Sequence, residues 1–300
     1  MKLKPVIIFF FSGLFLIGCR SSEKGFLVFQ TDFGLKDGAV SAMKGVALSV
    51  DPALKLFDLT HEIPPYNIWE AAYRLEQTYS YWPKGTVFVS VVDPGVGTNR
   101  HSIVAKTKSG HYIVSPDNGT LTLIAQSTGF ESIREIDENL NRRSGSDKSY
   151  TFHGRDVYAY TAARLASGLI LFDQVGPLYP LDSITKILFD PPVIMNDKSI
   201  HGTIPVLDIA YGNVWTDIPD SLIKKAGHQV GDSLEIQIFE SNKLIHKRTY
   251  LLCNTFGAVQ SGTGLAYFNS LMNLSFAINE GNFSDSFKIK SGPAWKIVVK

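Results

Sequence analysis

The chain has 300 residues, of which 44% are hydrophobic and 19% are charged, a composition that fits one large or two medium-sized globular domains. The formal net charge is only +1, and no long run of one sign occurs. Both facts argue against nucleic acid as the main partner, because phosphate binding needs a concentrated basic surface. We interpret the two short basic segments, 141–144 and 246–248, as solvent-facing.

The N-terminus has the pattern of an export signal. Two lysines precede an apolar run from Val6 to Ile17, which is shorter than the roughly 20 residues that a membrane-spanning helix needs. The run ends in LIGC, which resembles a bacterial lipobox at Cys19. The sequence predicts a signal peptide over residues 1–18 and a tether over residues 19–24. The protein is then exported and lipid-anchored on the periplasmic or cell-surface side of a bacterial membrane. A plain signal peptide or an uncleaved anchor is the alternative.

Cysteine and histidine usage limits the chemistry of metals and thiols. The chain has 2 cysteines, so lipidation of Cys19 leaves Cys253 alone and excludes a disulfide framework, a CxxC redox site and a cysteine-rich zinc site. The 7 histidines show none of the HxH, HxxxH or HExxH spacings that are typical of metal sites. We therefore predict no metal and no cofactor.

Strand-like and helix-like segments alternate from residue 25 to residue 191. Such alternation predicts an α/β domain with a largely parallel sheet, covered by helices on both faces. Ligands bind such sheets at the carboxyl ends of strands, which here are Asp32, Asp58 and Asp93. From apolar periodicity, the predicted strands are 26–32, 54–63, 85–93, 102–107 and 111–119, and the predicted helices are 38–50, 68–82, 121–129 and 154–168.

The pattern changes near residue 192. Two prolines interrupt the segment FDPPVIMND, and short strands separated by turns follow it. Strands at intervals of roughly 8 to 12 residues are typical of a small antiparallel barrel or sandwich. The predicted architecture is an N-terminal α/β domain over residues 25–191 and a smaller C-terminal all-β barrel domain over residues 192–300.

The first candidate for chemistry is the segment TDFGLKDGAV, in which Asp32 and Asp37 flank a glycine turn before a predicted helix. A carboxylate at the end of a strand can accept both hydroxyls of a ribose, as in dinucleotide-binding folds. The segment has no GxGxxG or GKS/T motif and is not a phosphate loop. For Asp37, a role at the start of the helix explains the position equally well.

The second candidate is VSVVDPGVGTNRHSI, where a strand ends at Asp93 and Arg100 follows seven positions later. Pro94, Gly95 and Gly97 favour a compact loop that suits the wall of a small-ligand site. If Asp93 and Arg100 enter one pocket, their remaining hydrogen-bonding capacity can hold a water or an anion. A structural salt bridge that only stabilises the turn is the simpler interpretation of this segment alone.

Two further segments carry polar groups that suit a site. In FHGRDVYAY, His153 precedes a predicted helix and can lie over the edge of the sheet, as a catalytic group or as a hydrogen-bonded scaffold residue. In LDIAYGNVWTDI, Tyr211 and Trp215 offer flat apolar faces. Asp208 and Asn213 offer hydrogen bonds beside them, and the combination fits a purine or nucleoside. An aromatic barrel core with capped turns is the alternative.

Together these segments resemble one family, the S-adenosylmethionine (SAM) hydroxide adenosyltransferases, which are related to bacterial fluorinase and chlorinase. The resemblance implies an α/β domain followed by a β-barrel domain, in a homotrimer whose active sites lie between one subunit's N-terminal domain and a neighbour's C-terminal domain. It also implies hydrolysis of SAM to adenosine and L-methionine, by attack of activated water on C5′ of the ribose. The motifs run in order through TDFGLKDGAV, THEIPPYNIWEAA, VVDPGVGTNRHSI, SPDNGTLT, FHGRDVYA, YGNVWT and NSLMNLSFAINEGN.

The resemblance also implies a role for individual residues. Asp93, Arg100 and His153 match the trio that positions and activates water. Leu271 and Met272 depart from the Arg-Gly or Ser-Gly that the family leads us to expect in the C-terminal substrate loop. The implied substrate contacts are Asp32 (ribose hydroxyls), Asp37 (methionine amino group), Tyr66 (sugar), Asp208 and Asn213 (polar contacts), Tyr211 (adenine), and Ser270 and Glu280 (C-terminal loop).

Two alternatives stay open. Halide-dependent adenosyl transfer needs an ion site free of negative charge, so Asp93 disfavours it, as does Gly154 in place of the serine of the halogenases. The other alternative is a lipid-anchored protein that binds a nucleoside or SAM without turnover, because export separates the protein from a substrate that is made in the cytoplasm.

Overall fold

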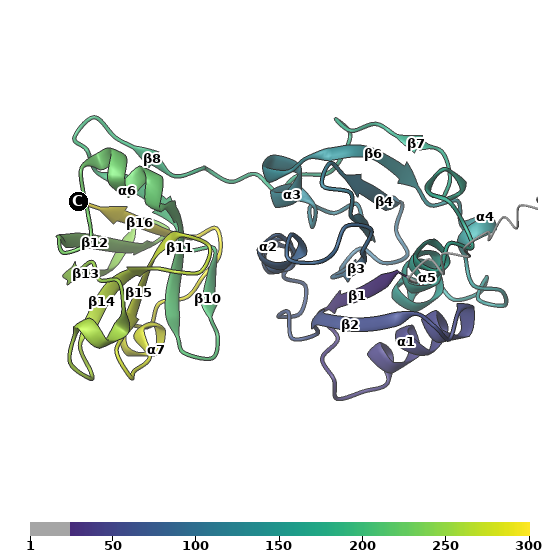
Figure 1. The fold of residues 1–300 in the computed structure, drawn as a ribbon, viewed down its shortest axis with the longest axis horizontal. Helices are drawn as coiled ribbons and strands as arrows, with labels where there is room; N and C mark the ends of the chain where they lie inside the picture. Colours follow the sequence, from purple (N-terminus) through teal and green to yellow (C-terminus); the bar gives the residue numbers. More distant parts are fainter. Residues whose placement is uncertain (1–24) are drawn as a thin grey trace, which may run out of the picture.

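The structure is a computed structural model that describes residues 25–300. The predicted signal peptide, the tether and the lipidation site Cys19 lie outside the described residues. No helix within residues 25–300 combines the length and the apolar character needed to span a bilayer. Figure 1 shows two domains side by side, joined by an extended segment between β7 (Leu178–Tyr179) and β8 (Val193–Ile194).

The N-terminal domain is built on one seven-stranded sheet with the order β2-β1-β3-β5-β4-β6-β7. Strands β2, β1, β3 and β5 are parallel neighbours, whereas β4 is antiparallel to β5 and β6. The predicted α/β domain with a largely parallel sheet is therefore confirmed. The bounds of the six strands that precede β7 are β1 Phe26–Thr31, β2 Lys55–Thr60, β3 Val87–Val91, β4 Ser102–Thr107, β5 Tyr112–Pro116 and β6 Phe130–Glu135.

Helices cover both faces of this sheet. Alternate residues of β1 divide between two cores, because successive side chains of a strand point to opposite faces. Leu27 and Phe29 pack with Met43 of α1, whereas Val28 packs with Leu75 of α2. The helices are α1 (Ala39–Val50), α2 (Ile68–Tyr79), α3 (Thr122–Ser127), the short α4 (Glu138–Asn141), and a π-helical turn (Gly154–Ala159) that continues as α5 (Tyr160–Ala166).

The chain leaves β1 and β3 toward opposite sides of the sheet, since β1 is followed by β2 on one side and β3 is followed by β4, beyond β5, on the other. Ligands bind doubly wound sheets at such a point, beyond the carboxyl ends of the strands. Asp32 follows β1 directly, and Asp93 lies two residues after β3. Asp58 instead lies inside β2, where it pairs with Lys44 at 2.6 Å and His61 at 2.9 Å. The prediction that Asp58 marks a strand end is wrong.

The C-terminal domain consists of two antiparallel sheets around one core, which confirms the predicted all-β domain. Leu234, Ile236 and Ile238 alternate along β12 and pack with Phe276 and Phe283 inside it. One sheet has the order β10-β11-β15-β14, with bounds Val206–Asp208, Asn213–Pro219, Asn273–Ile278 and Gly264–Phe268. The other has the order β13-β12-β16-β9-β8, and the bounds of its first four strands are β13 Lys243–Leu251, β12 Ser233–Glu240, β16 Trp295–Val299 and β9 Ile200–Thr203. The helices of this domain are α6 (Asp220–Ala226) and α7 (Phe283–Phe287).

Helix α2 attaches the second domain to the first. The indole nitrogen of Trp69 donates to the carbonyl of Pro205 at 3.0 Å, and the guanidinium of Arg74 donates to the carbonyl of Leu207 at 2.8 Å. Both acceptors lie at or just before β10, whose last residue is Asp208. The helix therefore fixes β10 of the C-terminal domain to the N-terminal domain.

Helix α2 also carries a buried carboxyl group with a testable effect on stability. Burial raises the pKa of Glu76 to about 7, and its Oε2 atom is buried without a hydrogen-bond partner. The folded state therefore binds the proton more tightly than the unfolded chain, and stability is lost as the pH rises from the ordinary pKa toward about 7. We expect Glu76→Gln to raise Tm relative to the parent protein at about pH 8 and to change it little at about pH 5.

Thermal unfolding at both pH values checks this expectation, with the exposed Glu62→Gln as the control that removes the same charge from the surface. An equal change of Tm at both pH values would contradict the buried, proton-binding state of Glu76.

Candidate active site

The loop after β3 brings a buried ion pair to the edge of the sheet. Arg100 Nε donates to Asp93 Oδ1 at 2.8 Å, and a second guanidinium nitrogen donates to Asp93 Oδ2. The Asp93 and Arg100 side chains are 5% and 10% exposed. The loop is tight because Gly97 has φ = +78°, and a Cβ there would lie 2.9 Å from the carbonyl oxygen of Tyr150. Such a bidentate pair fixes the orientation of the carboxylate.

Arg100 is held from two further directions. Its third guanidinium nitrogen donates to Ser102 Oγ at 3.1 Å, and its central carbon lies 5.5 Å from the centre of the Tyr158 ring. Burial lowers the pKa of Arg100, but hydrogen bonding to Asp93 and electrostatic interactions with Tyr158, Asp93 and Glu138 together outweigh it, and the pKa is raised. Burial also raises the pKa of the Tyr158 hydroxyl. Arg100 is therefore cationic and Tyr158 is neutral at ordinary pH.

The structure brings His153 to this pair. Its Nδ1 atom lies 3.3 Å from a guanidinium nitrogen of Arg100, and its Nε2 atom lies 3.2 Å from one of Arg142. His153 is 6% exposed, and burial lowers its pKa. The charges of Arg100 and Arg142 lower the pKa further, whereas Glu138 and Asp93 oppose them, and the net shift is downward. The imidazole is therefore neutral near pH 7.

Arg142 is a site residue that sequence reasoning missed. The interpretation of segment 141–144 as solvent-facing is wrong for Arg142, whose side chain is 13% exposed, although Arg143 beside it is exposed. Arg142 follows α4 and pairs with Glu138 four residues earlier. That spacing is typical of an ion pair on a helix. Nothing in the sequence, however, connects the pair with His153.

A cavity of about 220 Å³ lies at the carboxyl ends of β1 and β3, and its lining includes three predicted residues, Asp32, Tyr66 and Asp93, together with Phe33 and Pro65. The backbone N–H of Tyr66 donates to Asp32 Oδ2 at 2.9 Å. Tyr66 has φ = +68°, a conformation that costs a non-glycine residue energy, and its side chain remains 73% exposed. This strained backbone conformation places the aromatic ring of Tyr66 at the rim of the cavity.

Asp37 is not among the residues that line this cavity. Its Oδ1 atom accepts a hydrogen bond from the backbone N–H of Ala39 at 2.9 Å, and the residue is exposed. This is the helix-start geometry that the sequence allowed as an alternative. The structure therefore brings Asp32, but not Asp37, to the cavity beside Asp93.

A second cavity, of about 700 Å³, lies in the C-terminal domain. The candidate residues of this domain line it, namely Trp215 and the five with implied substrate contacts: Asp208, Tyr211, Asn213, Ser270 and Glu280. Asn213 Nδ2 donates to Asp208 Oδ2 at 3.2 Å, so one amide end of Asn213 is satisfied inside the site. The Tyr211 side chain is 70% exposed at its border. The cavity thus combines a free aromatic face with directional polar groups.

Two backbone features shape this second cavity. Gly212 has φ = +67°, and a Cβ there would lie 1.9 Å from Asn282 Oδ1, so only glycine fits. Met272 keeps a left-handed conformation, φ = +61°, at the position where the family resemblance leads us to expect glycine. Sequence reasoning missed lining residues that come from separate turns and strands, namely Phe256, Tyr267, Asn269, Asn279 and Asn282.

The two cavities are separate within one chain, and we call the first the N-terminal half-site and the second the C-terminal half-site. The residues that line the first all come from the N-terminal domain, and those that line the second all come from the C-terminal domain. Across residues 25–300, no three histidine, cysteine, aspartate or glutamate side chains are grouped so as to hold a metal ion. The first half-site can orient a water with a carboxylate. The second can bind a flat, polar-edged molecule.

Comparisons with known proteins agree with this arrangement. The family model described as the SAM hydroxide adenosyltransferase N-terminal domain matches residues 27–176, and the model of the corresponding C-terminal domain matches residues 202–296. A solved structure of an uncharacterized conserved protein from Thermotoga maritima superposes with a TM-score of 0.83 at 34% identity, covering 91% of this chain and 99% of that one.

Curated relatives cover most of the chain as well. The (R)-S-adenosyl-L-methionine hydrolase of Methanocaldococcus jannaschii is 44% identical over 265 residues, which are 83% of this chain and 92% of the relative. The protein of the same name from Salinispora tropica is 33% identical, over 90% of this chain and 97% of its own. A fluorinase from Actinoplanes is 26% identical, over 89% and 95%. Because both domain models match in order and these relatives align over nearly their full length, the chain belongs to the SAM hydroxide adenosyltransferase family.

Proposed function

We propose that the protein hydrolyses SAM to adenosine and L-methionine by attack of water on C5′ of the ribose. The observation that carries this proposal is the buried Asp93–Arg100 pair, which stands with neutral His153 beside the cavity that Asp32 and Tyr66 also line. The relatives named as SAM hydrolases, at 44% and 33% identity, support the same reaction.

The substrate carries its own leaving group, because the positively charged sulfur departs as a neutral thioether and needs no acid. Water lacks nucleophilicity and alignment. Asp93 uses one lone pair on each oxygen to accept from Arg100, so its remaining lone pairs can accept a hydrogen of the water. The C5′–O bond forms as the C5′–S bond breaks, and the electron pair of the C5′–S bond goes to sulfur. The proton that the attacking water loses passes to Asp93 and then to solvent.

Two physical effects then contribute to the rate. Alignment of the water with C5′ removes an entropic cost that is worth several kcal/mol in well-oriented reactions, and acceptance of its proton contributes about 10²- to 10⁴-fold. Arg100 fixes the carboxylate, and neutral His153 packs against Arg100 without adding a positive charge. No step in this scheme needs a metal or a cofactor.

We assign the remaining predicted residues to the substrate. Asp32 and Tyr66 face the ribose, and Asp37, whose Oδ1 atom already accepts from the start of α1, faces the amino group of methionine with its other oxygen. The C-terminal cavity receives the adenine on Tyr211, and Asp208, Asn213, Ser270 and Glu280 provide polar contacts there. Since each half-site is lined by one domain alone, we propose a homotrimer in which the C-terminal half-site of a neighbouring subunit completes the N-terminal half-site.

We also propose export and lipid anchoring at Cys19, which rest on the sequence alone. The signal LIGC and the short tether would place the catalytic domains close to a bacterial membrane.

Product analysis in H₂¹⁸O tests the reaction. We expect the protein that lacks residues 1–18 to release adenosine with ¹⁸O at its 5′ hydroxyl and unlabelled methionine, because water forms a bond to C5′ and the thioether leaves intact. The sample should contain both sulfur epimers of SAM, since the names of the relatives specify the R form. Mass spectrometry locates the label, and the reaction is run with and without added chloride.

Each other outcome contradicts the proposal in its own way. Binding of SAM without release of adenosine would indicate a binding protein. A chloride-dependent 5′-chloro product would indicate a halogenase, and label in the amino-acid product would place the attack elsewhere.

A further inference from the structure

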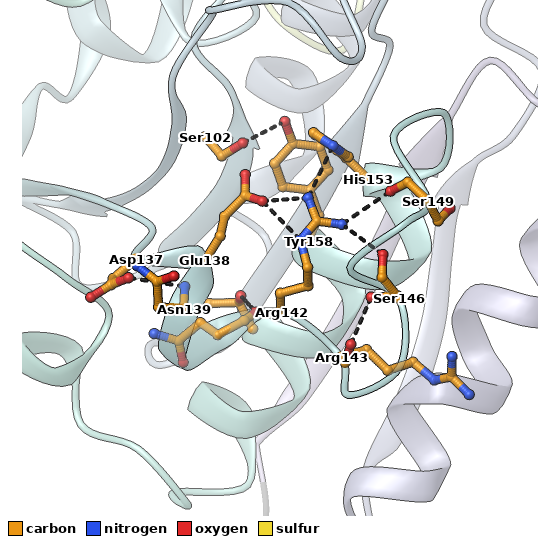
Figure 2. Close-up of polar contacts among 12 residues, drawn as sticks. Ser102, Asp137, Glu138, Asn139, Arg142, Arg143, Ser146, Ser149, His153 and Tyr158 are labelled. Carbon is orange, nitrogen blue, oxygen red and sulfur yellow. Dashed lines mark hydrogen bonds and ion pairs between the residues drawn. The ribbon is translucent and has the colours of Figure 1, made fainter.

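Arg142 lies at the centre of a contact network that the proposed reaction does not use (Figure 2). Its Nε atom donates to Glu138 Oε2 at 2.9 Å, and a terminal nitrogen donates to the same oxygen. It also donates to the backbone carbonyls of Ser146 at 3.4 Å and Ser149 at 3.1 Å. Figure 2 shows the guanidinium enclosed by α4, the 146–149 turn and His153. Arg142 thus has little freedom to move.

The charges around His153 are arranged in two opposed pairs. Arg100 faces Nδ1 from the loop after β3, and Arg142 faces Nε2 from the end of α4. Each guanidinium holds its own carboxylate, Asp93 on one side and Glu138 on the other. These four groups are the charged neighbours of the imidazole. Tyr158 lies beside Arg100 and adds no charge.

This geometry restricts the imidazole. Both of its nitrogens face guanidinium N–H donors, and a neutral imidazole offers one acceptor lone pair whereas a protonated one offers none. The proton on a charged imidazole would point at a guanidinium group on either side. The imidazole is therefore kept neutral: one nitrogen accepts from an arginine, and the other, which carries the N–H, only packs against the second guanidinium group. Because the ring lies between the two arginines, a displacement of Arg142 changes the position of the ring against Arg100.

We propose that Arg142, held by Glu138, is a positioning residue for the hydrolysis: it fixes His153 against Arg100 and thereby fixes the Asp93 carboxylate that receives the proton of water. This inference rests on the proposed function. Arg142 lines neither the N-terminal nor the C-terminal half-site but a separate cavity of about 450 Å³, which Glu138 also lines. We therefore infer that it acts through His153 and not on the substrate.

Steady-state kinetics separate positioning from substrate binding. We expect Arg142→Gln to lower kcat by about 10- to 100-fold, the loss typical of a displaced reacting group, and to change KM by less than about threefold. The matched control is Arg143→Gln, which removes the same charge from the adjacent, exposed residue and should leave both constants unchanged. Arg142→Lys keeps the positive charge but loses the planar set of guanidinium N–H donors, so we expect a kcat between those of Arg142→Gln and the parent. A kcat of Arg142→Gln within about twofold of the parent would overturn the proposal.

The pH dependence supplies a readout that a purely structural role would not move. Arg142 lowers the pKa of His153 and Glu138 raises it. Removal of the positive charge in Arg142→Gln should therefore shift the acidic limb of the kcat profile, where His153 gains its proton, to higher pH. Glu138→Gln should shift it to lower pH, and Arg142→Lys should leave it in place. Shifts of the same sign in Arg142→Gln and Glu138→Gln would contradict the charge arrangement.

NMR titration of the imidazole keeps this inference separate from the proposed function. The ring signals of His153, assigned by comparison with His153→Gln, should show the same opposite shifts in Arg142→Gln and Glu138→Gln, whatever the reaction is. Opposite shifts in a protein that releases no adenosine would defeat the proposed hydrolysis and keep the charge arrangement. Unshifted signals in an active enzyme would defeat the role of Arg142 and keep the hydrolysis.

Discussion

Asp93→Asn is expected to lower kcat for SAM hydrolysis by about 10³-fold, within the range by which a positioned proton acceptor accelerates reactions. The amide is nearly isosteric, but it carries no charge and presents an NH₂ group where Arg100 now finds an oxygen. Water would then lose its proton acceptor at the cavity. Affinity for adenosine should change by less than about threefold, because in the proposed mechanism Asp93 contacts the attacking water and not the base.

Single-turnover release of adenosine and calorimetric titration with adenosine measure the two quantities separately. Asp58→Asn is the control, since Asp58 pairs with Lys44 in the same domain but is 40% exposed and lies in the edge strand β2. Thermal unfolding must accompany both variants, because a buried arginine without its carboxylate destabilises the fold. A folded Asp93→Asn protein with turnover near that of the parent would remove Asp93 from the mechanism.

Oligomers that mix two different variant subunits are expected to recover activity that neither variant has alone. If one subunit's N-terminal half-site works with a neighbour's C-terminal half-site, Asp93→Asn damages the first and Tyr211→Ala the second. Co-expression of the two variants with different tags would then create composite sites in which both halves are intact. Random assembly at equal amounts makes about one quarter of all sites intact, but every mixed trimer has one intact site of three, so turnover of the mixed trimers should return to about one third of the parent value.

Purification through both tags in sequence selects the mixed oligomers for this measurement. The control is a mixture of the separately purified variants that have had no chance to exchange subunits, which should stay inactive. Turnover in the selected oligomers no greater than in either variant alone would mean that each chain uses its own two half-sites, and the inter-subunit arrangement would be wrong.

Local sequence patterns predicted much of the fold. The nearly continuous run of apolar, mostly β-branched residues in 85–93 identifies β3, and the helical spacing in 68–82 identifies α2, because both patterns follow from local backbone geometry and need no distant contact. The placement of Asp58 failed because this aspartate was taken as a strand end, although the strand-like pattern itself runs on to residue 63. In the structure β2 continues past Asp58 to Thr60.

The residues of the candidate site also divide into those that the sequence predicted and those that only the structure shows. Motif order pointed to Asp93, Arg100 and His153, and the structure brings the three together. Arg142 escaped notice because a basic residue in a polar segment such as NRRS is ordinarily solvated, and only the fold shows that its side chain is covered. Asp37 shows the converse, since its spacing from Asp32 suited a shared site but its carboxylate serves the start of α1.

The sequence by itself determined the α/β and all-β halves, the family resemblance and the identity of most candidate residues, because periodicity and motif order are properties of neighbouring positions. Only the tertiary structure decided that His153 stands between Arg100 and Arg142. That arrangement depends on a contact between residues 53 positions apart, Arg100 and His153, which no local pattern encodes.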